Sequence, residues 1–286
     1  MESDLIEYFK IDVKLEPKEI NPYSFIGSTL RGAFGVALKR VVCINPAFKC
    51  EGCFASKNCI YYDFFEKKDI THKFCFDFEL NPKNYDFSLF LFEEASEYLP
   101  YVVSAIYKML VEIGLTKNRE KFKIQEIICN DELIFKDEKF DLSGVNKREF
   151  EFKELDKNID SLKIILKTPL RIKHQGKLLD HIPSADILLR SIYNRLRDLK
   201  NLPRKKIDFE PKCKISKANV AFFDQKRRSN RQKRSLKIGG IIGEIELKNV
   251  DSMSYNYFKL AEIIGIGKQT SFGMGRIKVK NANANA

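Results

Sequence analysis

Residues Leu162–Lys173 read LKIILKTPLRIK, a run of large apolar and β-branched residues that is typical of a strand. The following segment, Ser184–Leu202, places Ile and Leu at helical spacing, and Pro183 and Pro203 mark the two ends of that helix. The other elements of this half are predicted as strands at Lys214–Phe223 and Gly239–Leu247, a helix at Met253–Ile264 capped by Ser252, and a strand at Gly275–Lys280. The order strand, helix, strand, strand, helix, strand is that of a ferredoxin-like domain.

The N-terminal half allows the same order of elements. They are predicted as a strand at Leu5–Leu15, a helix at Ser28–Val42, strands at Phe74–Leu80 and Phe87–Phe92, a helix at Glu93–Ile113 interrupted or bent at Pro100, a strand at Lys121–Cys129 and a hairpin at Glu132–Glu154. We therefore expect an α+β protein of two tandem ferredoxin-like βαββαβ domains, at residues 1–155 and 160–280, with the polar run Glu154–Ser161 between them. An insertion rich in cysteine, residues 43–60, interrupts the first domain, and the tail 281–286 has no core-forming residue.

Composition limits the class of protein. The chain has 286 residues, of which 44% are hydrophobic and 31% charged, so it can form globular domains with real cores. No run approaches the roughly 18 apolar residues of a membrane span, and residues 1–4 do not begin a signal peptide. We therefore expect a cytoplasmic protein with reduced cysteines and no membrane partner.

The charge is distributed unevenly along the chain. Residues 1–160 carry 23 Lys and Arg against 29 Asp and Glu, a net charge of −6, whereas residues 161–286 carry 28 against 10, a net charge of +18. Such asymmetry points to a polyanion as partner, either nucleic acid or an anionic membrane surface. A basic surface that only keeps the protein in solution is the weaker interpretation.

Four of the seven cysteines, Cys43, Cys50, Cys53 and Cys59, lie within seventeen residues with the spacing C-x6-C-x2-C-x5-C. A C-x2-C pair holds two thiolates near one metal ion, and two more thiolates complete a tetrahedral set. This spacing favours a metal site over four unrelated buried thiols, with structural zinc and an iron–sulfur cluster both open. The metal would hold the insertion together, and no cofactor is expected for catalysis.

Two basic segments are candidates for holding nucleic acid. The run Lys226–Arg234, KRRSNRQKR, has six basic residues in nine and is predicted to form the loop of a β-hairpin, where its side chains can reach phosphates. The segment Gly265–Gly275, GIGKQTSFGMG, has four glycines and can bring backbone N–H groups against a phosphate, although it matches neither a P-loop nor a dinucleotide fingerprint. The predicted RNA-binding residues are Arg227, Arg228, Arg231, Lys233, Arg234, Gly265, Gly267, Lys268, Gly273, Gly275 and Arg276.

Catalytic residues are marked less clearly. The chain has three histidines and contains no Ser-His-Asp order, no HExxH motif and no acidic metal cluster. RNA supplies its own nucleophile, the 2′-OH, so a protein can cleave it by providing a base, an acid and groups that stabilise phosphate charge. The candidates with this chemistry are Tyr23, Arg31, Lys39 and His174. Each of them, taken singly, also fits a surface or packing role.

Several segments together resemble a known family. They are Leu30–Gly35 (LRGAFG), Thr168–Arg171 (TPLR), Arg228–Gly240, and Gly265–Arg276 (GIGKQTSFGMGR). In these segments the chain resembles the CRISPR-associated repeat-RNA processing endoribonucleases of the RAMP superfamily, which cut precursor guide RNA within each repeat. The resemblance implies tandem ferredoxin-like domains, metal-independent cleavage by 2′-OH attack, a 2′,3′-cyclic phosphate product, and a glycine-rich loop that helps to hold the RNA.

The resemblance also implies partners, and it exposes one departure from the family. CRISPR repeat RNA is the expected substrate, and proteins of an effector complex are the partners expected beside it. Many relatives place a catalytic histidine on or near the first helix, whereas Ser28–Val42 contains none. The alternative to an enzyme is therefore a non-catalytic RNA-binding subunit of an RNA-guided effector complex. A metal-cluster redox protein is disfavoured because no cofactor-binding fingerprint is present.

Overall fold

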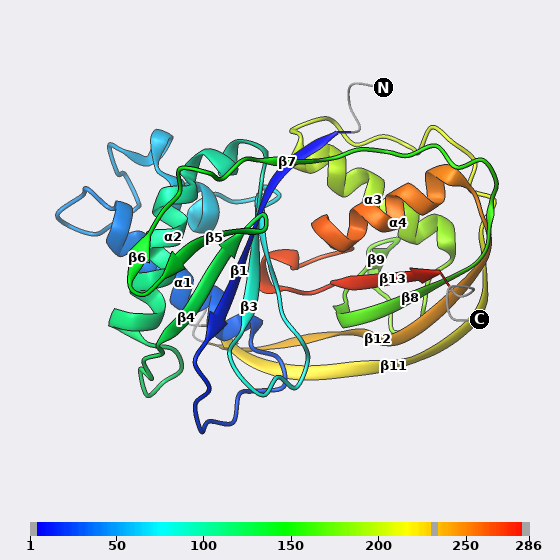
Figure 1. Ribbon diagram of the computed structural model, residues 1–286. Helices are drawn as coiled ribbons and strands as arrows, with labels where there is room; N and C mark the ends of the chain where they lie inside the picture. The colour runs from blue at the N-terminus through cyan, green and yellow to red at the C-terminus, as the bar shows by residue number, and fades with distance from the viewer. Residues whose placement is uncertain (1–4, 230–233, 282–286) are drawn as a thin grey trace. The chain divides into compact units, whose positions relative to one another are not determined.

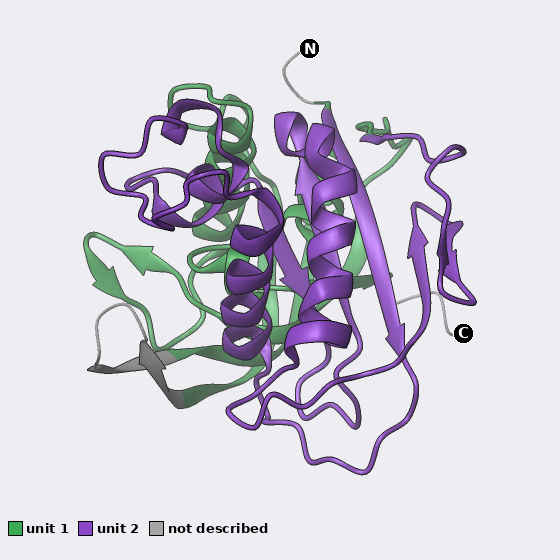
Figure 2. Ribbon diagram, turned by 90° about the vertical axis from the view of Figure 1, so that its left-hand side faces the viewer, with its two compact units in different colours: residues 1–5, 150–286 green, residues 6–149 purple. Residues whose placement is uncertain are grey.

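The computed structural model describes residues 5–229 and 234–281, and the chain divides into two compact units. The N-terminal unit is residues 6–149, and the C-terminal unit is residues 1–5 and 150–286 (Figure 2). The division at residue 150 lies just upstream of the polar run Glu154–Ser161. Residue Lys153, next to that run, belongs to the packed part of the C-terminal unit, because its backbone N–H donates to Asn256 Oδ1 at 2.9 Å. The predicted tail, residues 282–286 in particular, lies outside the described residues.

The N-terminal unit is a sheet with helices packed against one another beside it (Figure 1). Its elements are β1 (Ile6–Leu15), α1 (Gly27–Val42), β2 (Phe74–Asp77), β3 (Phe87–Phe92), α2 (Leu99–Tyr107), β4 (Ile124–Cys129), β5 (Glu132–Lys136), β6 (Lys139–Phe140) and β7 (Arg148–Phe150). The sheet order is β2-β3-β1-β4-β5-β6, with β7 paired to β1. Its first four strands give the antiparallel arrangement of a ferredoxin-like domain, and β5 and β6 extend one edge.

The C-terminal unit repeats this arrangement. Its elements are β8 (Ile159–Leu170), β9 (Lys173–His174), β10 (Lys177–Leu178), α3 (Ala185–Leu199), β11 (Lys214–Ser229), β12 (Arg234–Val250), α4 (Ser252–Ile264) and β13 (Ile277–Asn281). The four-stranded sheet has the order β11-β12-β8-β13. In both units the first strand of the motif therefore lies between the third and the fourth. The predicted fold class, two tandem ferredoxin-like domains, is confirmed.

The cap predicted for the last helix is wrong, and the helix predicted at Glu93–Ile113 has the expected bounds but is divided. The long helix predicted at Glu93–Ile113 is three segments: a 3₁₀-helix η3 (Glu93–Tyr98), α2, and a π-helix η4 (Lys108–Ile113). Pro100 lies in the first turn of α2, where its missing N–H has no partner to lose, so it begins that helix and does not bend it. Helix α4 is capped by Asp251 and not by Ser252, since the Asp251 carboxylate accepts the backbone N–H of Ser254 at 2.9 Å.

Each unit has its own apolar core. In both, alternate residues of the central strand are buried under the two helices. The core side chains include Ile11, Val13, Phe34, Leu38, Phe76, Leu89, Val102 and Ile106 in the N-terminal unit and Ile164, Leu166, Leu188, Ile192, Leu196, Ile245, Phe258 and Ile264 in the C-terminal unit. Within the part of the chain that the structure describes, no helix combines the length and the apolar character that crossing a membrane requires.

The loop between α4 and β13 is folded tightly onto the end of β8. Thr168, which is fully buried in β8, donates its hydroxyl to the Gly273 carbonyl at 2.6 Å and accepts the Arg276 N–H at 2.9 Å. The Gly275 N–H donates to the Pro169 carbonyl at 3.0 Å. Gly275 has φ of +70°, and a Cβ added there would lie 1.9 Å from the Ile266 carbonyl oxygen. Only glycine fits this position.

We expect Gly275→Ala to lower the free energy of unfolding by about 2 kcal/mol or more, because forced positive φ alone accounts for about 1–3 kcal/mol. Urea denaturation monitored by circular dichroism measures the effect. The matched control is Gly144→Ala, where an added Cβ meets nothing within 4 Å. Equal unfolding midpoints for the two variants would show that the loop rearranges without strain and would contradict the prediction.

Candidate functional site

Helix α1 carries a stripe of two cations that lie over aromatic rings. Arg31, Gly35 and Lys39 are four residues apart and therefore share one face of the helix. The Arg31 guanidinium carbon lies 4.8 Å from the centre of the Phe65 ring, and Lys39 Nζ lies 4.9 Å from the centre of the Tyr61 ring. Both distances are within the range of cation–π attraction.

The two rings are held in place by the segment that follows the cysteine-rich insertion. Tyr61 and Phe65, at the start of and within the π-helix η2 (Tyr62–Glu66), stack with centroids 5.4 Å apart and planes at 17°. The Tyr61 hydroxyl donates to Glu66 Oε1 at 3.0 Å. Gly35 allows the Phe65 ring to lie directly on α1, because a Cβ at this position would be 2.9 Å from the ring. The LRGAFG segment thus builds a flat, cationic helix face.

A histidine joins this face from outside the helix. His72, which lies two residues before the start of β2, places Nε2 at 3.5 Å from Arg31 Nη2. A guanidinium can only donate, so Nε2 is the acceptor in this contact and a neutral ring carries its proton on Nδ1. The sequence analysis does not include His72 among its candidates, since 41 residues separate it from Arg31. The only feature of the sequence that marks His72 is its position just before a predicted strand of the same domain.

The structure brings some of the predicted catalytic residues together. Arg31 and Lys39 share the α1 face, whereas Tyr23 lies in the loop before α1 with 55% of its surface exposed. His174 belongs to the other unit. It ends the short strand β9, directly before a two-residue turn in which Gln175 and Gly176 have φ of +48° and +79°. The strand predicted through Lys173 therefore ends at Leu170, because the following residues form this separate hairpin.

The basic run between the two long strands is not simply a loop. Residues 226–229 continue β11 and Arg234 begins β12, with Ser229 opposite Arg234 in the antiparallel register. Antiparallel pairing needs only backbone groups, so a polar sequence does not end it. The predicted contacts Arg227, Arg228 and Arg234 are thus strand residues. Arg231 and Lys233 lie outside the described residues.

The glycine-rich segment has the conformation that its composition predicts. Gly265, Gly267, Gly273 and Gly275 have φ of +76°, +82°, +78° and +70°. Several of its backbone N–H groups are already used inside the protein: that of Lys268 donates to the Arg171 carbonyl at 2.7 Å, and that of Gly273 to the Thr270 carbonyl at 2.8 Å. The Lys268 residue is itself exposed. The segment thus presents a cation from a rigid backbone.

Arg276 has a different role from the one expected of an RNA contact. It is 1% exposed, and its guanidinium donates to the carbonyl of Ile263 at 2.6 Å and to that of Glu262. These carbonyls belong to the last turn of α4, whose partial negative charge favours a cation. Arg276 therefore stabilises the end of a helix inside the C-terminal unit.

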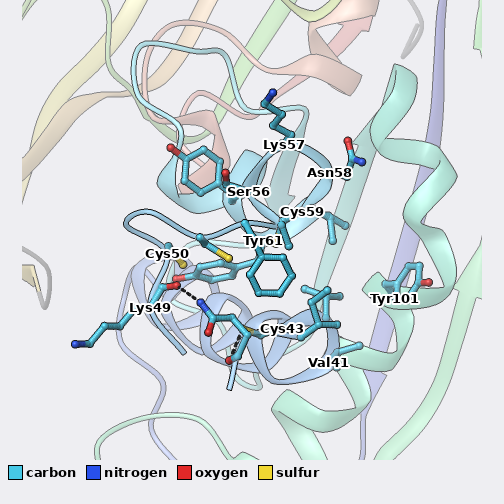
Figure 3. Close-up of a pocket in the computed structure, with 18 of the residues that line it drawn as sticks. Val41, Cys43, Lys49, Cys50, Ser56, Lys57, Asn58, Cys59, Tyr61 and Tyr101 are labelled. Carbon is cyan, nitrogen blue, oxygen red and sulfur yellow. Dashed lines mark hydrogen bonds between the residues drawn. The ribbon is translucent and has the colours of Figure 1, made fainter. Parts of the chain in front are cut away.

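The cysteines fall into two groups by their burial. Cys75, Cys129 and Cys213 are buried, and burial raises the pKa of the Cys129 thiol to about 12. Cys43, Cys50, Cys53 and Cys59 are half-buried and line one pocket (Figure 3). None of the seven, all within the described residues, forms a disulfide. Among the described residues, no three or more His, Cys, Asp or Glu side chains are already gathered around a point that a metal ion could occupy.

The chain combines two ferredoxin-like units, a cationic first helix and a glycine-rich loop before the last strand. Residues 164–277 match the family model of the CRISPR-associated endoribonuclease Cas6. Residues 6–147 match the model of an N-terminal domain named AF_1859_N. The match to the Cas6 model lies within the C-terminal unit and confirms the resemblance to CRISPR repeat-RNA processing endoribonucleases.

Solved structures show the same fold along nearly the whole chain. The product complex of Cas6 (TTHB231) from Thermus thermophilus has a TM-score of 0.58 at 14% identity, covering 96% of this chain and 99% of that chain. A crystal structure of Cas6b has a TM-score of 0.51 at 16% identity, with coverage of 96% and 98%. A Cas6-RT-Cas1–Cas2 complex has a TM-score of 0.58 at 11% identity, where this chain covers 29% of the other. No curated protein matches the chain in sequence.

Arg276 and Lys268 are expected to differ sharply when each is replaced by Ala. Arg276→Ala leaves buried α4 carbonyls without a donor and should lower the free energy of unfolding by about 3 kcal/mol. Lys268→Ala should leave stability unchanged and reduce the slope of log K against log salt for single-stranded RNA by about 0.7, the value of one phosphate contact. Denaturant titration and filter binding across a salt series measure both. A stable Arg276→Ala protein with a flatter salt slope would instead make Arg276 an RNA contact.

Proposed function

We propose that the chain cleaves CRISPR repeat RNA by metal-independent attack of a 2′-OH on the adjacent phosphodiester. A bond forms between O2′ and phosphorus while the bond from phosphorus to O5′ breaks. A base takes the 2′-OH proton, and an acid protonates the leaving O5′. The products are a 2′,3′-cyclic phosphate and a 5′-hydroxyl end.

The observation that carries the proposal is the contact of Arg31 Nη2 with His72 Nε2 at 3.5 Å on the first helix. An imidazole is a competent base near neutral pH, and a guanidinium stabilises the charge that develops on the phosphoryl oxygens. His72 thus supplies, from the segment before β2, the imidazole that α1 itself lacks, and in this proposal its Nε2 leaves the contact with Arg31 to take the 2′-OH proton. Lys39, eight residues further along the same helix face and in cation–π contact with Tyr61, adds a second positive charge.

The remaining candidates have supporting roles in this proposal. Tyr23 is exposed beside the start of α1 and has a phenol that can donate to phosphate. His174 stands at the tip of a tight turn and is half-exposed, so its imidazole is the second candidate base. We place both after His72, because the contact of His72 with Arg31 is the observation that carries the proposal.

RNA is held, in this proposal, by the basic C-terminal half. Residues 161–286 carry 28 Lys and Arg against 10 Asp and Glu, and phosphate neutralisation supplies most non-specific affinity. Lys268 on the glycine-rich loop and the paired strands around residues 226–234 are the candidate contacts. Solved relatives include a Cas6 bound to its product and a Cas6 within a complex with Cas1 and Cas2. We extend to this chain the binding of repeat RNA, association with CRISPR effector proteins, and a cytoplasmic location.

A single 2′-deoxy substitution in the repeat RNA should abolish cleavage at that position, because it removes the nucleophile. Cleavage of the unmodified RNA should continue in EDTA, since the base and the charge stabiliser are side chains. Denaturing gels with mapped ends and a test for the cyclic phosphate measure both results. Equal cutting of the deoxy RNA would overturn the mechanism. Binding without cutting of either RNA would favour the non-catalytic RNA-binding subunit.

His72→Ala should lower the single-turnover rate by about 10²-fold or more, the usual contribution of a general base. Arg31→Ala should lower it by about 10²–10³-fold through lost charge stabilisation. His181→Ala is the matched control, because that imidazole is 71% exposed and pairs only with the neighbouring Asp180 among the described contacts. Thermal melting confirms that each variant folds. Full activity of His72→Ala would transfer the role to His174, which His174→Ala then tests.

A further inference from the structure

The cysteine-rich insertion has a burial pattern that is the reverse of an apolar core. None of residues 43–59 is buried. Its large apolar side chains point to solvent, with Ile44 70%, Phe48 47% and Phe54 75% exposed. The four cysteines, in contrast, are less exposed than these residues and all line one pocket. The segment therefore leaves its large apolar side chains more exposed than its thiols, although Ile44 and Phe54 also line the pocket, and burial of apolar surface does not explain this pattern.

Hydrogen bonds do not explain the fold of the insertion either. Within the described chain, every hydrogen bond made by residues 44–58 joins residues no more than four apart. Asn45 shows the pattern: its side chain bonds the N–H of Ala47 and the carbonyl of Lys49. Local turns of this kind shape a loop without attaching it to anything. A segment with neither a core nor long-range bonds needs another cross-link.

The four thiols lie at three places in the insertion: its two ends and a turn in its middle. Cys43 directly follows α1, with its backbone N–H bonded to the Lys39 carbonyl at 3.0 Å. The Cys59 carbonyl accepts the N–H of Asp63 in η2 at 3.0 Å. Cys50 and Cys53 close a turn between them, through a backbone bond of 3.2 Å from the Cys53 N–H to the Cys50 carbonyl. Figure 3 shows Cys43, Cys50 and Cys59 around the same pocket.

We propose that Cys43, Cys50, Cys53 and Cys59 bind one Zn²⁺ as a tetrahedral set of thiolates. The thiols line one pocket and must still converge on the ion, with Zn–S distances of about 2.3 Å. The short-range hydrogen bonds of the insertion permit this movement, and metal binding is commonly coupled to such ordering. Zinc needs only the four thiolates, whereas an iron–sulfur cluster also needs inorganic sulfide. The site is structural because all four positions are taken by protein ligands.

The ion would fix the two ends of the insertion to its central turn. One end is the last turn of α1, which carries Lys39, and the other leads directly into Tyr61 and Phe65. These are the rings that lie over Lys39 and Arg31. The zinc therefore maintains the aromatic support of the cationic helix face. This consequence for cleavage rests on the proposed function, while zinc binding does not.

Metal content and thiol protection test the site without RNA. Protein purified anaerobically should contain about one equivalent of zinc per chain by elemental analysis, and Cys50→Ser or Cys53→Ser should reduce it about tenfold. Cys213→Ser, which removes a buried thiol, and Lys57→Ala, in the same insertion, should retain the metal. In the wild-type protein, zinc should protect the four insertion cysteines from alkylation, as mapped by mass spectrometry. This measurement does not depend on the folding of any variant.

Three results would overturn the proposal. They are a metal-free wild-type protein whose four insertion thiols react equally with and without added Zn²⁺, iron with inorganic sulfide in place of zinc, and full zinc retention in both Cys50→Ser and Cys53→Ser. The cleavage assay is read separately. Zinc bound at one equivalent in a protein that does not cut RNA would leave this site standing and reject the proposed function. Cleavage by a metal-free protein with reactive thiols would do the reverse.

Discussion

The C-terminal end of helix α4 sets the constraint on which the second half of the molecule depends. Its last carbonyls have no partner within the helix and are buried, so they must be satisfied by other groups. Two buried arginines do this: Arg195 from α3 donates to the Ile264 carbonyl at 2.5 Å, and Arg276 to that of Ile263 at 2.6 Å. The loop from Gly265 has to reverse direction and deliver Arg276 to that point. Its glycines and its bonds to the end of β8 follow from this geometric requirement.

This arrangement divides the positive charge of the C-terminal half into two kinds. Arg195 and Arg276 lie inside and neutralise the partial charge of a helix end, where an unpaired charge would be strongly unfavourable. Lys268, on the same loop as Arg276, is exposed and remains available to a polyanion. The net charge of +18 for residues 161–286 therefore overstates the charge that can face RNA. The composition counts buried and exposed cations alike, and only the burial of each side chain in the structure distinguishes them.

The sequence was sufficient for the fold because its signals are local. Strand β3 has the predicted bounds, and α1 and α4 each begin one residue before the predicted start, since periodicity and turn residues act over a few positions. The π-helical turns at Lys108–Ile113 and the long strands through the basic run were missed for the same reason: backbone pairing and π-helical turns leave no mark in hydrophobic spacing. His72 illustrates the limit for the site. Its contact with Arg31 spans 41 residues and an insertion, and no local pattern reports it.

The aromatic support of α1 has a consequence that a salt bridge would not have. A carboxylate beside Arg31 or Lys39 would fix the side chain but would neutralise it before any phosphate arrived. A ring fixes a cation by about 0.5–2 kcal/mol and leaves its net charge unchanged. Phe65 and Tyr61 thus help to position two cations on one helix face without adding a negative charge of their own, and Gly35 is the residue that lets a ring come so close to the helix.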